Sequence, residues 1–244
     1  MSKRPRTTAV KSSEWKKKKI VKKDPLDRWA LEPGFKMNLK RVDTTVSAYF
    51  GVTTSTAGLI LNGIPQGVGD NSRVGQRVRM FNFTVRGEIN FLPTATAITQ
   101  PDSLRLLIVY DRQTNGVAPP YSNVIANITT GTSLNLDPPN WYERGRYKIL
   151  RDWVINVPST SATVAAGLIT ANGQPNVPHP NSSEFNLHFF KALKGKIDTI
   201  YSGTGATAAN VNGGGIFVMA QLGSNQNGNV WAYALTASAE FMDV

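Results

Sequence analysis

The sequence has 244 residues, no cysteine and two histidines. Without cysteine, neither a disulfide bond nor a thiolate metal site can form. His179 and His188 do not lie in the spacing of a zinc site, and neither the Gly-x-Ser-x-Gly elbow nor the His-Glu-x-x-His motif of hydrolases occurs. Because these catalytic constellations are missing, we predict a protein that is not an enzyme and needs no cofactor.

Long apolar segments are also missing. No run approaches the roughly 20 apolar residues of a membrane span, and no apolar segment follows the N-terminal charges as it would in a signal peptide. We therefore expect a soluble protein that is made inside a cell and has no membrane partner.

Acidic residues are few, 16 in total, and they are scattered. Asp43, Asp70, Asp137 and Asp198 offer the oxygen ligands that a calcium ion between subunits would need. Their spacing gives no support for such a site, so we predict that the protein holds no metal.

Basic residues are concentrated at one end of the chain. The first 41 residues contain 14 Lys and Arg and 4 Asp and Glu, a net charge of +10, whereas the remainder contains 13 and 12. The chain therefore divides into a basic arm and an almost neutral body. The arm has too few apolar residues to offset the entropy of ordering. We predict a disordered basic arm and hinge over residues 1–35 and a single jelly-roll domain over residues 36–244.

The arm is the candidate site for binding nucleic acid. Lysines contact phosphates as point charges, so their binding is largely independent of base sequence and sensitive to salt. Trp15 adds a surface on which a base can stack. A solvated tail that only improves solubility is the alternative. The residues predicted to contact nucleic acid are Lys3, Arg4, Arg6, Lys11, Trp15, Lys16, Lys17, Lys18, Lys19, Lys22, Lys23, Arg28, Lys36, Lys40 and Arg41.

The arm also has the shape of a bipartite nuclear localisation signal. Lys3-Arg4 and the run from Lys16 to Lys19 are separated by eleven residues. Many basic arms match this pattern. Nuclear import receptors are therefore a further candidate partner.

The body shows the periodicity of β-structure most clearly over residues 76–92. Val78 and Met80 have one phase and the apolar residues after them have the other, which predicts a bulge near Met80 and Phe81. The apolar residues after Met80 share one face of the strand: Phe81, Phe83, Val85, Ile89 and Phe91. Gly87 is the one gap on that face.

Other segments of the body follow the same logic. The nearly continuous apolar run 104–110 predicts a strand that is buried on both faces. A short helix is expected within 121–128, and the long loops 158–183 and 203–215 are candidates for the outer surface or for subunit contacts. Further strands are expected at residues 36–50, 58–61, 147–157, 185–189, 197–201, 216–222 and 231–241. About eight strands without a long helix predict an all-β fold, a single eight-stranded antiparallel jelly-roll sandwich.

Four arginines cluster near the start of the strongest strand pattern: Arg73, Arg77, Arg79 and Arg86. We expect them to face nucleic acid or a neighbouring subunit, or else to cover the polar face of the strand.

Three stretches carry a resemblance to a known family: GQRVRMFNFTVRGEI from Gly75, LLIVYDRQTNG from Leu106 and RYKILRDW from Arg146. With a basic arm before an all-β body, they resemble the capsid proteins of small circular single-stranded DNA viruses, including geminivirus-like coat proteins. Satellite tobacco necrosis virus-like capsids, which enclose RNA, are similar in plan.

The resemblance implies an icosahedral shell, a homo-oligomer of about 60 copies. The arms would point inward to the genome, and Arg28, Lys36, Lys40 and Arg41 would line the inner surface. We therefore hypothesise a capsid protein of the virion that enters the host nucleus and packages single-stranded nucleic acid, DNA rather than RNA.

Three alternatives remain open from the sequence. The first is the capsid of a small single-stranded RNA, satellite-like virus. The second is a non-capsid β-barrel module that binds single-stranded nucleic acid, which would need aromatic side chains on an exposed strand face. The third is a carbohydrate-binding jelly roll, for which Trp141 and Tyr142 are the candidate exposed aromatics.

Overall fold

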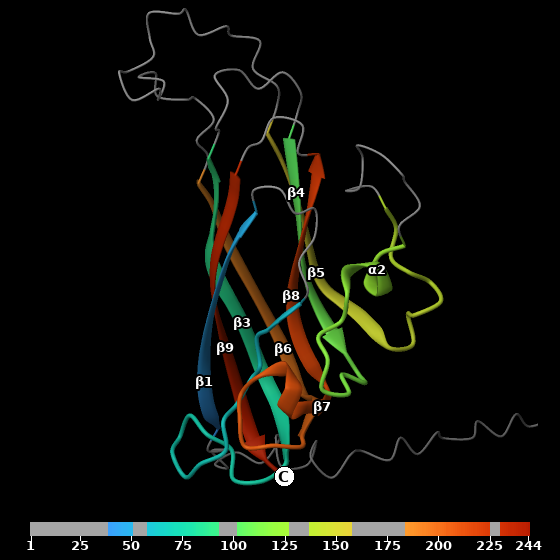
Figure 1. The fold of residues 1–244 in the computed structure, drawn as a ribbon. Coiled ribbons are helices and arrows are strands. Elements are labelled where there is room, and N and C mark those ends of the chain that lie inside the picture. The colour runs from blue at the N-terminus through green and yellow to red at the C-terminus, as the bar shows by residue number, and fades with distance from the viewer. Residues whose placement is uncertain (1–38, 51–57, 93–101, 127–136, 158–183, 225–229) are drawn as a thin grey trace, which may run out of the picture. The chain divides into compact units, whose positions relative to one another are not determined.

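The computed structural model describes residues 39–50, 58–92, 102–126, 137–157, 184–224 and 230–244. The predicted division between arm and body, after residue 35, and the predicted loop 158–183 lie outside these residues. No helix in the described part is long and apolar enough to cross a membrane. The elements, shown in Figure 1, are β1 (Lys40–Phe50), β2 (Leu59–Ile60), β3 (Arg77–Leu92), β4 (Asp102–Asp111), α2 (Tyr121–Val124), β5 (Tyr147–Val157), β6 (Glu184–Tyr201), the 3-10 helix η2 (Ala208–Asn210), β7 (Val211–Gly213), β8 (Gly215–Ser224) and β9 (Val230–Asp243).

The strands form two antiparallel sheets. One sheet has the order β1-β9-β3-β6-β7 and the other has the order β2-β8-β4-β5. Without the short β7, the strand pairs nest along the chain: β4 pairs with β5, β3 with β6, β2 with β8 and β1 with β9. Successive pairs alternate between the two sheets, which is the winding of a jelly roll. The predicted eight-stranded jelly roll is confirmed, and β7 is an addition to it.

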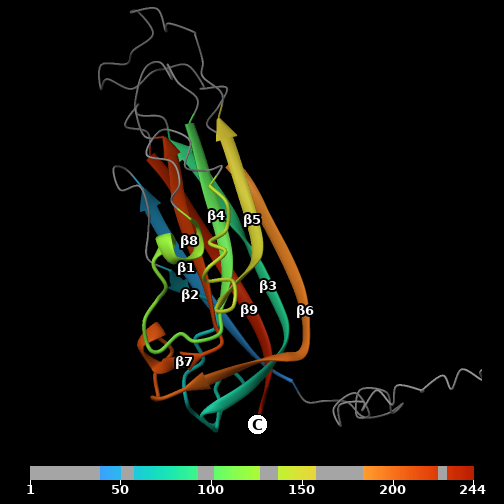
Figure 2. The ribbon, with the colours of Figure 1, turned by 90° about the vertical axis from the view of Figure 1, so that its right-hand side faces the viewer.

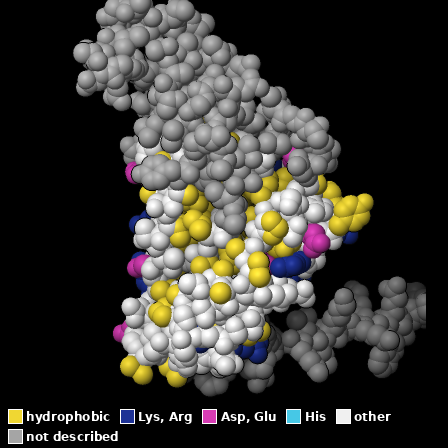
Figure 3. Space-filling model, viewed as in Figure 1, with side chains coloured by type: hydrophobic (Ala, Val, Ile, Leu, Met, Phe, Trp, Pro, Cys, Tyr) yellow, Lys and Arg dark blue, Asp and Glu magenta, His cyan; other side chains and the backbone are white. Residues whose placement is uncertain are grey.

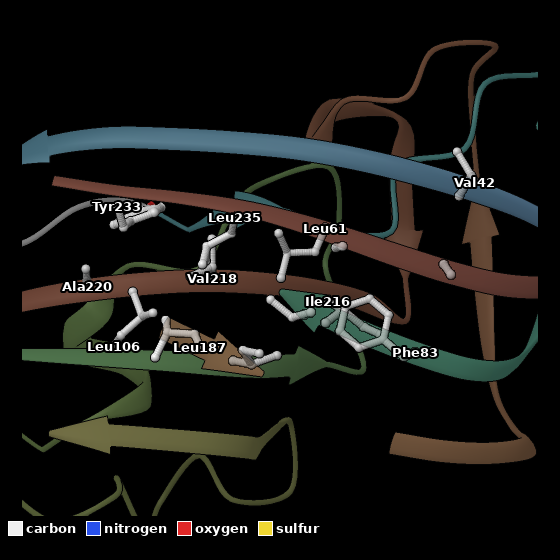
Figure 4. Close-up of a cluster of buried hydrophobic side chains, with 14 of the residues drawn as sticks. Val42, Leu61, Phe83, Leu106, Leu187, Ile216, Val218, Ala220, Tyr233 and Leu235 are labelled. Atoms are coloured by element: carbon white, nitrogen blue, oxygen red, sulfur yellow. The ribbon is translucent and has the colours of Figure 1, made fainter. Parts of the chain in front are cut away.

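The hydrophobic core lies between the two sheets (Figure 4). Phe83 of β3 and Leu235 of β9 come from the five-stranded sheet, whereas Leu106 of β4 and Val218 of β8 come from the other sheet, and all four are fully or almost fully buried. Each buried side chain of this size contributes about 1.5–3 kcal/mol to folding. Alternation of apolar and polar residues along the strands therefore determines which face of each sheet turns inward.

Gly87 lets β3 approach its neighbours closely. It pairs with Leu235 of β9 and Leu187 of β6. A Cβ atom at this position would lie 2.1 Å from the backbone oxygen of Ala234 and 2.7 Å from Cδ2 of Leu235. The gap that the sequence shows on the apolar face is thus a place where only glycine fits.

The four-stranded sheet is covered on both faces, as the apolar run of β4 predicted. Leu107 and Val109 of β4 point away from the main core and pack with Tyr121 and Val124 of α2 and with Tyr147 of β5. The short helix lies outside the sheets, in the segment where the sequence placed it.

The bulge predicted in β3 is confirmed, but one prediction about it is wrong. The register of β3 shifts between Met80 and Asn82 against both of its neighbours. Met80 and Phe83 are both buried, because the extra residue turns both halves of the strand toward the core. Phe81 is the extra residue, so its ring lies beside Gly195 and not on the core face where it was expected.

A second bulge, in β5, interrupts the alternation of apolar and polar residues along the strand predicted at 147–157. Ile108 of β4 pairs with Arg151 and Val109 pairs with Ile149, so Leu150 is the additional residue. Ile149 consequently packs under α2, whereas Trp153 packs against the main core. Residues that share one phase in the sequence therefore lie on opposite faces of the sheet.

The two strands predicted at 185–189 and 197–201 are parts of one bent strand, β6 (Figure 2). Lys194 and Gly195 both have positive φ, 52° and 69°, in the segment that opposes Phe81. This irregularity lets the strand change direction and continue. Because the residues at the bend are polar, the sequence predicted a break between two strands there.

The jelly roll gives the body two different ends (Figure 1). Lys40 pairs with Phe241 at one end, which we call the arm end, and Phe50 pairs with Trp231 at the other, which we call the loop end. The eleven residues of β1 between them span about 35 Å. The strand termini that lead into the connections 51–57, 93–101, 158–183 and 225–229 all lie at the loop end.

Substitution of Gly87 by Ala should destabilise the fold by about 1–3 kcal/mol, because the added methyl group overlaps the backbone of β9. Gly145→Ala is the matched control, since a Cβ at Gly145 meets no atom within 4 Å. We expect the control to change the free energy of unfolding by less than about 0.5 kcal/mol. Equal urea midpoints for the two variants would contradict the close approach at Gly87.

Candidate nucleic-acid interface

Most of the predicted nucleic-acid contacts, from Lys3 to Lys36, lie outside the described residues, as does the candidate nuclear localisation signal. Lys40 and Arg41 belong to the described body and start β1 at the arm end. The body therefore shows where the basic segment is attached.

Lys40 fastens the beginning of β1 to the last residues of the chain. Its Nζ lies 2.9 Å from Oδ2 of Asp243 and donates a hydrogen bond to the carbonyl oxygen of Ser72 at 3.0 Å. The N–H of Arg41 donates to the carbonyl oxygen of Asp70 at 3.2 Å. The charge of Lys40 is matched by a carboxylate, so its main role in the body is to hold the entry point of the chain.

Arg41 is more open, with 60% of its side chain exposed. Its Nε donates to Oδ1 of Asp43 at 3.1 Å and its Nη2 donates to Oγ of Ser238 at 3.0 Å. The hydrogen bond from Ser238, together with Arg41, lowers the pKa of Asp43 against the opposing effect of burial. These side chains line a polar hollow of about 300 Å³ on the outer face of the five-stranded sheet, which Arg86 also lines.

Arg73 is fully buried, so the expectation that it faces nucleic acid, a neighbouring subunit or solvent is wrong. Its Nε donates to the carbonyl oxygen of Ile64 at 3.0 Å, and its two terminal nitrogens donate to the carbonyl oxygens of Gly75 and Gly203. The guanidinium carbon lies 4.2 Å from the centroid of the Tyr201 ring. Arg73 therefore ties the segment after β2 to the segment after β6.

Asn62 completes a buried polar network beside Arg73. Its side-chain amide donates to Oγ1 of Thr199 at 2.9 Å and to the carbonyl oxygen of Gly214 at 3.0 Å. Its Oδ1 accepts the N–H of Ile216 at 2.8 Å, and its backbone oxygen accepts the hydroxyl of Tyr201 at 2.7 Å. Thr199 and Tyr201 belong to β6 and Ile216 to β8, so the network joins the two sheets at the arm end.

Arg77 and Arg79 share one carboxylate on the neighbouring strand. The Nε of Arg79 donates to Oδ1 of Asp198 at 2.9 Å, and Arg77 donates from Nε and Nη2 to Oδ2. Burial alone would raise the pKa of Asp198, but these hydrogen bonds outweigh it and lower the pKa. Arg77 keeps half of its side chain exposed, with 51% open to solvent.

Two further ion pairs, which the sequence did not predict, hold β4 and β5. The guanidinium of Arg105 binds both carboxylate oxygens of Asp152, at 3.1 and 2.7 Å, and that of Arg146 binds both oxygens of Asp111, at 3.0 and 3.1 Å. Arg105 interrupts an apolar run, and a charge buried on a central strand requires a partner. That interruption was the signal in the sequence from which a buried partner for Arg105 could have been predicted.

Exposed aromatic side chains occur on the segment before β5. Trp141 is 67% exposed and Tyr142 is 99% exposed, and the guanidinium carbon of Arg144 lies 5.5 Å from the centroid of the Trp141 ring. These residues are the structural basis of the carbohydrate-binding alternative. In the parts of the chain that the structure describes, no group of three or more His, Asp and Glu side chains comes together that could hold a metal ion.

No protein-family model and no curated protein matches this chain. Among solved structures, it is similar to the 60-mer BFDV capsid protein, with 10% identity, coverage of 83% of this chain and 91% of that chain, and a TM-score of 0.28. It is also similar to a chain of Desmodium yellow mottle tymovirus, with 10% identity, coverage of 98% and 96%, and a TM-score of 0.25. Neither similarity assigns the chain to a family.

Replacement of Arg73 by Met should destabilise the body by about 3 kcal/mol or more, because one buried and two partly buried carbonyl groups lose their donor. Arg86→Met makes the same chemical change on an exposed side chain and should cost less than about 0.5 kcal/mol. The free energy of unfolding in urea compares the two. Our assignment of Arg73 as a buried tie is incorrect if both variants are as stable as the parent.

Proposed function

We propose that this protein is a viral capsid protein that assembles into a closed shell and packages single-stranded nucleic acid through its N-terminal arm. The observation that carries the proposal is the division of charge, +10 in the first 41 residues and +1 in the rest. Charge of this density on a segment with few apolar residues serves to neutralise a polyanion.

The geometry of the body supports one orientation of the subunit in the shell. The basic segment joins the jelly roll at Lys40, at the arm end, while four connections leave from the loop end. In the proposed shell the arm end faces the interior and the loop end faces outward. Residues 203–215, an outer-surface candidate from the sequence, lie at the arm end beside Arg73, so we now assign them to the interior or to subunit contacts.

The surface of the body agrees with this division of roles. On the part of the face in Figure 3 that is not grey, hydrophobic side chains, uncharged polar side chains and backbone cover most of the area, with few Lys and Arg. In a shell of about 60 copies, arms of charge +10 would supply on the order of 600 positive charges to the interior. Counterions would neutralise the phosphates beyond that number.

The structure weakens one alternative. A β-barrel module that binds single strands stacks bases on aromatic side chains of an exposed strand face. Phe83, Phe91, Trp231 and Tyr233 are instead buried between the sheets. Phe190, 56% exposed, is an exception among the described strand residues.

The nature of the genome is the finer part of the proposal. We favour single-stranded DNA and entry into the host nucleus through import receptors, as the sequence resemblance implies. A single-stranded RNA genome is the second candidate. Digestion of the packaged material with DNase or RNase distinguishes the two.

Deletion of residues 1–23 should abolish packaging and leave the body folded, because the arm supplies most of the charge. We expect the ratio of absorbance at 260 and 280 nm of purified particles to fall to the value of protein alone. A variant with the same 23 residues in scrambled order keeps the charge and should package normally, since phosphate contacts do not depend on sequence. Truncated particles with undiminished nucleic acid would refute the role of the arm.

A further inference from the structure

Four basic side chains gather where β3 and β6 are irregular. Arg77 and Arg79 lie at the start of β3, and Lys194 and Lys196 lie in the bend of β6. The Cδ of Arg79 packs against Gly195: a Cβ on that glycine would lie 3.2 Å from it. The four residues therefore form one cluster, although more than a hundred positions separate the two strands in the sequence.

The backbone of the bend is unusual. Lys194 has a φ of 52°, a backbone conformation that residues other than glycine adopt at a cost in energy. The bend leaves Lys194 and Lys196 exposed, and neither ammonium group has an ion-pair partner among the described residues. A conformation that costs energy and presents two unpaired charges indicates a function for those charges.

The cluster is strongly positive where the rest of the sheet is balanced. Asp198 is its one acidic member, and it orients both arginines, so the cluster has four positive charges and one negative charge. Arg77 uses its Nε and Nη2 on Asp198, and its remaining N–H donors are available at the surface. Elsewhere on the outer face of this sheet the charges of opposite sign offset one another: Arg41, Asp43, Arg86, Glu88 and Glu240.

The cluster lies at the place where the arm joins the body. Lys40 of β1 pairs with Phe241 of β9, Phe241 pairs with Met80 of β3, and Met80 pairs with Ile197 of β6. Lys40 and Ile197 are thus in one row of the sheet, about 14 Å apart across three strand spacings. A nucleic-acid strand bound by the arm would pass within reach of the cluster.

We propose that Arg77, Arg79, Lys194 and Lys196 form a second phosphate-binding surface, which holds the backbone of single-stranded nucleic acid against the body. The inference rests on the proposed packaging function and extends it from the arm to the jelly roll. Arginines held by Asp198 provide fixed donors, and the lysines of the bend provide mobile point charges.

The test is the salt dependence of binding to a labelled single-stranded oligonucleotide, with the full-length chain. For Lys194→Gln/Lys196→Gln, the slope of log Kobs against log[NaCl] should become shallower by about 1.4, since each lost phosphate contact on a single strand removes about 0.7. If the affinity extrapolated to 1 M salt is unchanged, binding at 0.1 M falls about 25-fold. Lys194→Arg/Lys196→Arg keeps the charges and should retain the original slope.

Lys148→Gln/Arg151→Gln is the matched control, because it removes two exposed charges from β5 in the other sheet. This control should keep the original slope. An unchanged slope for the Lys194/Lys196 variant, or an equal loss in both variants, would overturn the inference.

Two other partners would give different results, and each would also overturn the inference. If the slope for the oligonucleotide is unchanged but assembled mass falls, the cluster contacts a second copy of the chain. If binding to heparin is lost while binding to the oligonucleotide is kept, the cluster recognises a sulfated polysaccharide. The arm-truncation experiment reports separately on packaging, so failure of the proposed function is distinguishable from failure of this surface.

Discussion

The buried polar network at the arm end is the constraint on which the arrangement of the body depends. Asn62 accepts and donates hydrogen bonds at once: its amide donates to Thr199 of β6 and its Oδ1 accepts the N–H of Ile216 in β8, so it links the two sheets at the arm end. Arg73 is buried, and its hydrogen bonds go to three backbone carbonyl oxygens and not to a carboxylate. Through them it ties the adjoining segments together. A buried network of this kind is costly unless every member is bonded, so it fixes one geometry. It thereby gives the arm a rigid point of attachment.

Much of the fold was predictable, because alternation along a strand directly reflects burial on one face. The apolar run of β4, the alternation of β3 and its bulge all lie where the sequence placed them. The bulge in β5 and the bend in β6 were not predictable in the same way. An inserted residue changes the facing of all later residues without changing their local composition. Leu150 and Lys194 look like ordinary strand residues until their partners are known.

The proposed nucleic-acid-binding surface was predictable only in its charge. The concentration of lysines before residue 24 is visible in the sequence, whereas the roles of individual arginines depend on partners brought together by the fold. Arg73 is a buried tie and Arg77 is an exposed donor held by Asp198, although the two lie four residues apart. The jelly roll is thus near-neutral, with the attachment point of the basic segment and a basic cluster at one end and four connections at the opposite end.

The measurement that tests this account most directly is electron microscopy of the purified full-length protein, combined with the ratio of its absorbance at 260 and 280 nm. The account predicts uniform closed particles with the absorbance of a nucleoprotein. Monomers or small oligomers across a range of salt and pH would contradict it, because neither the division of charge nor the two-ended jelly roll would then serve a shell.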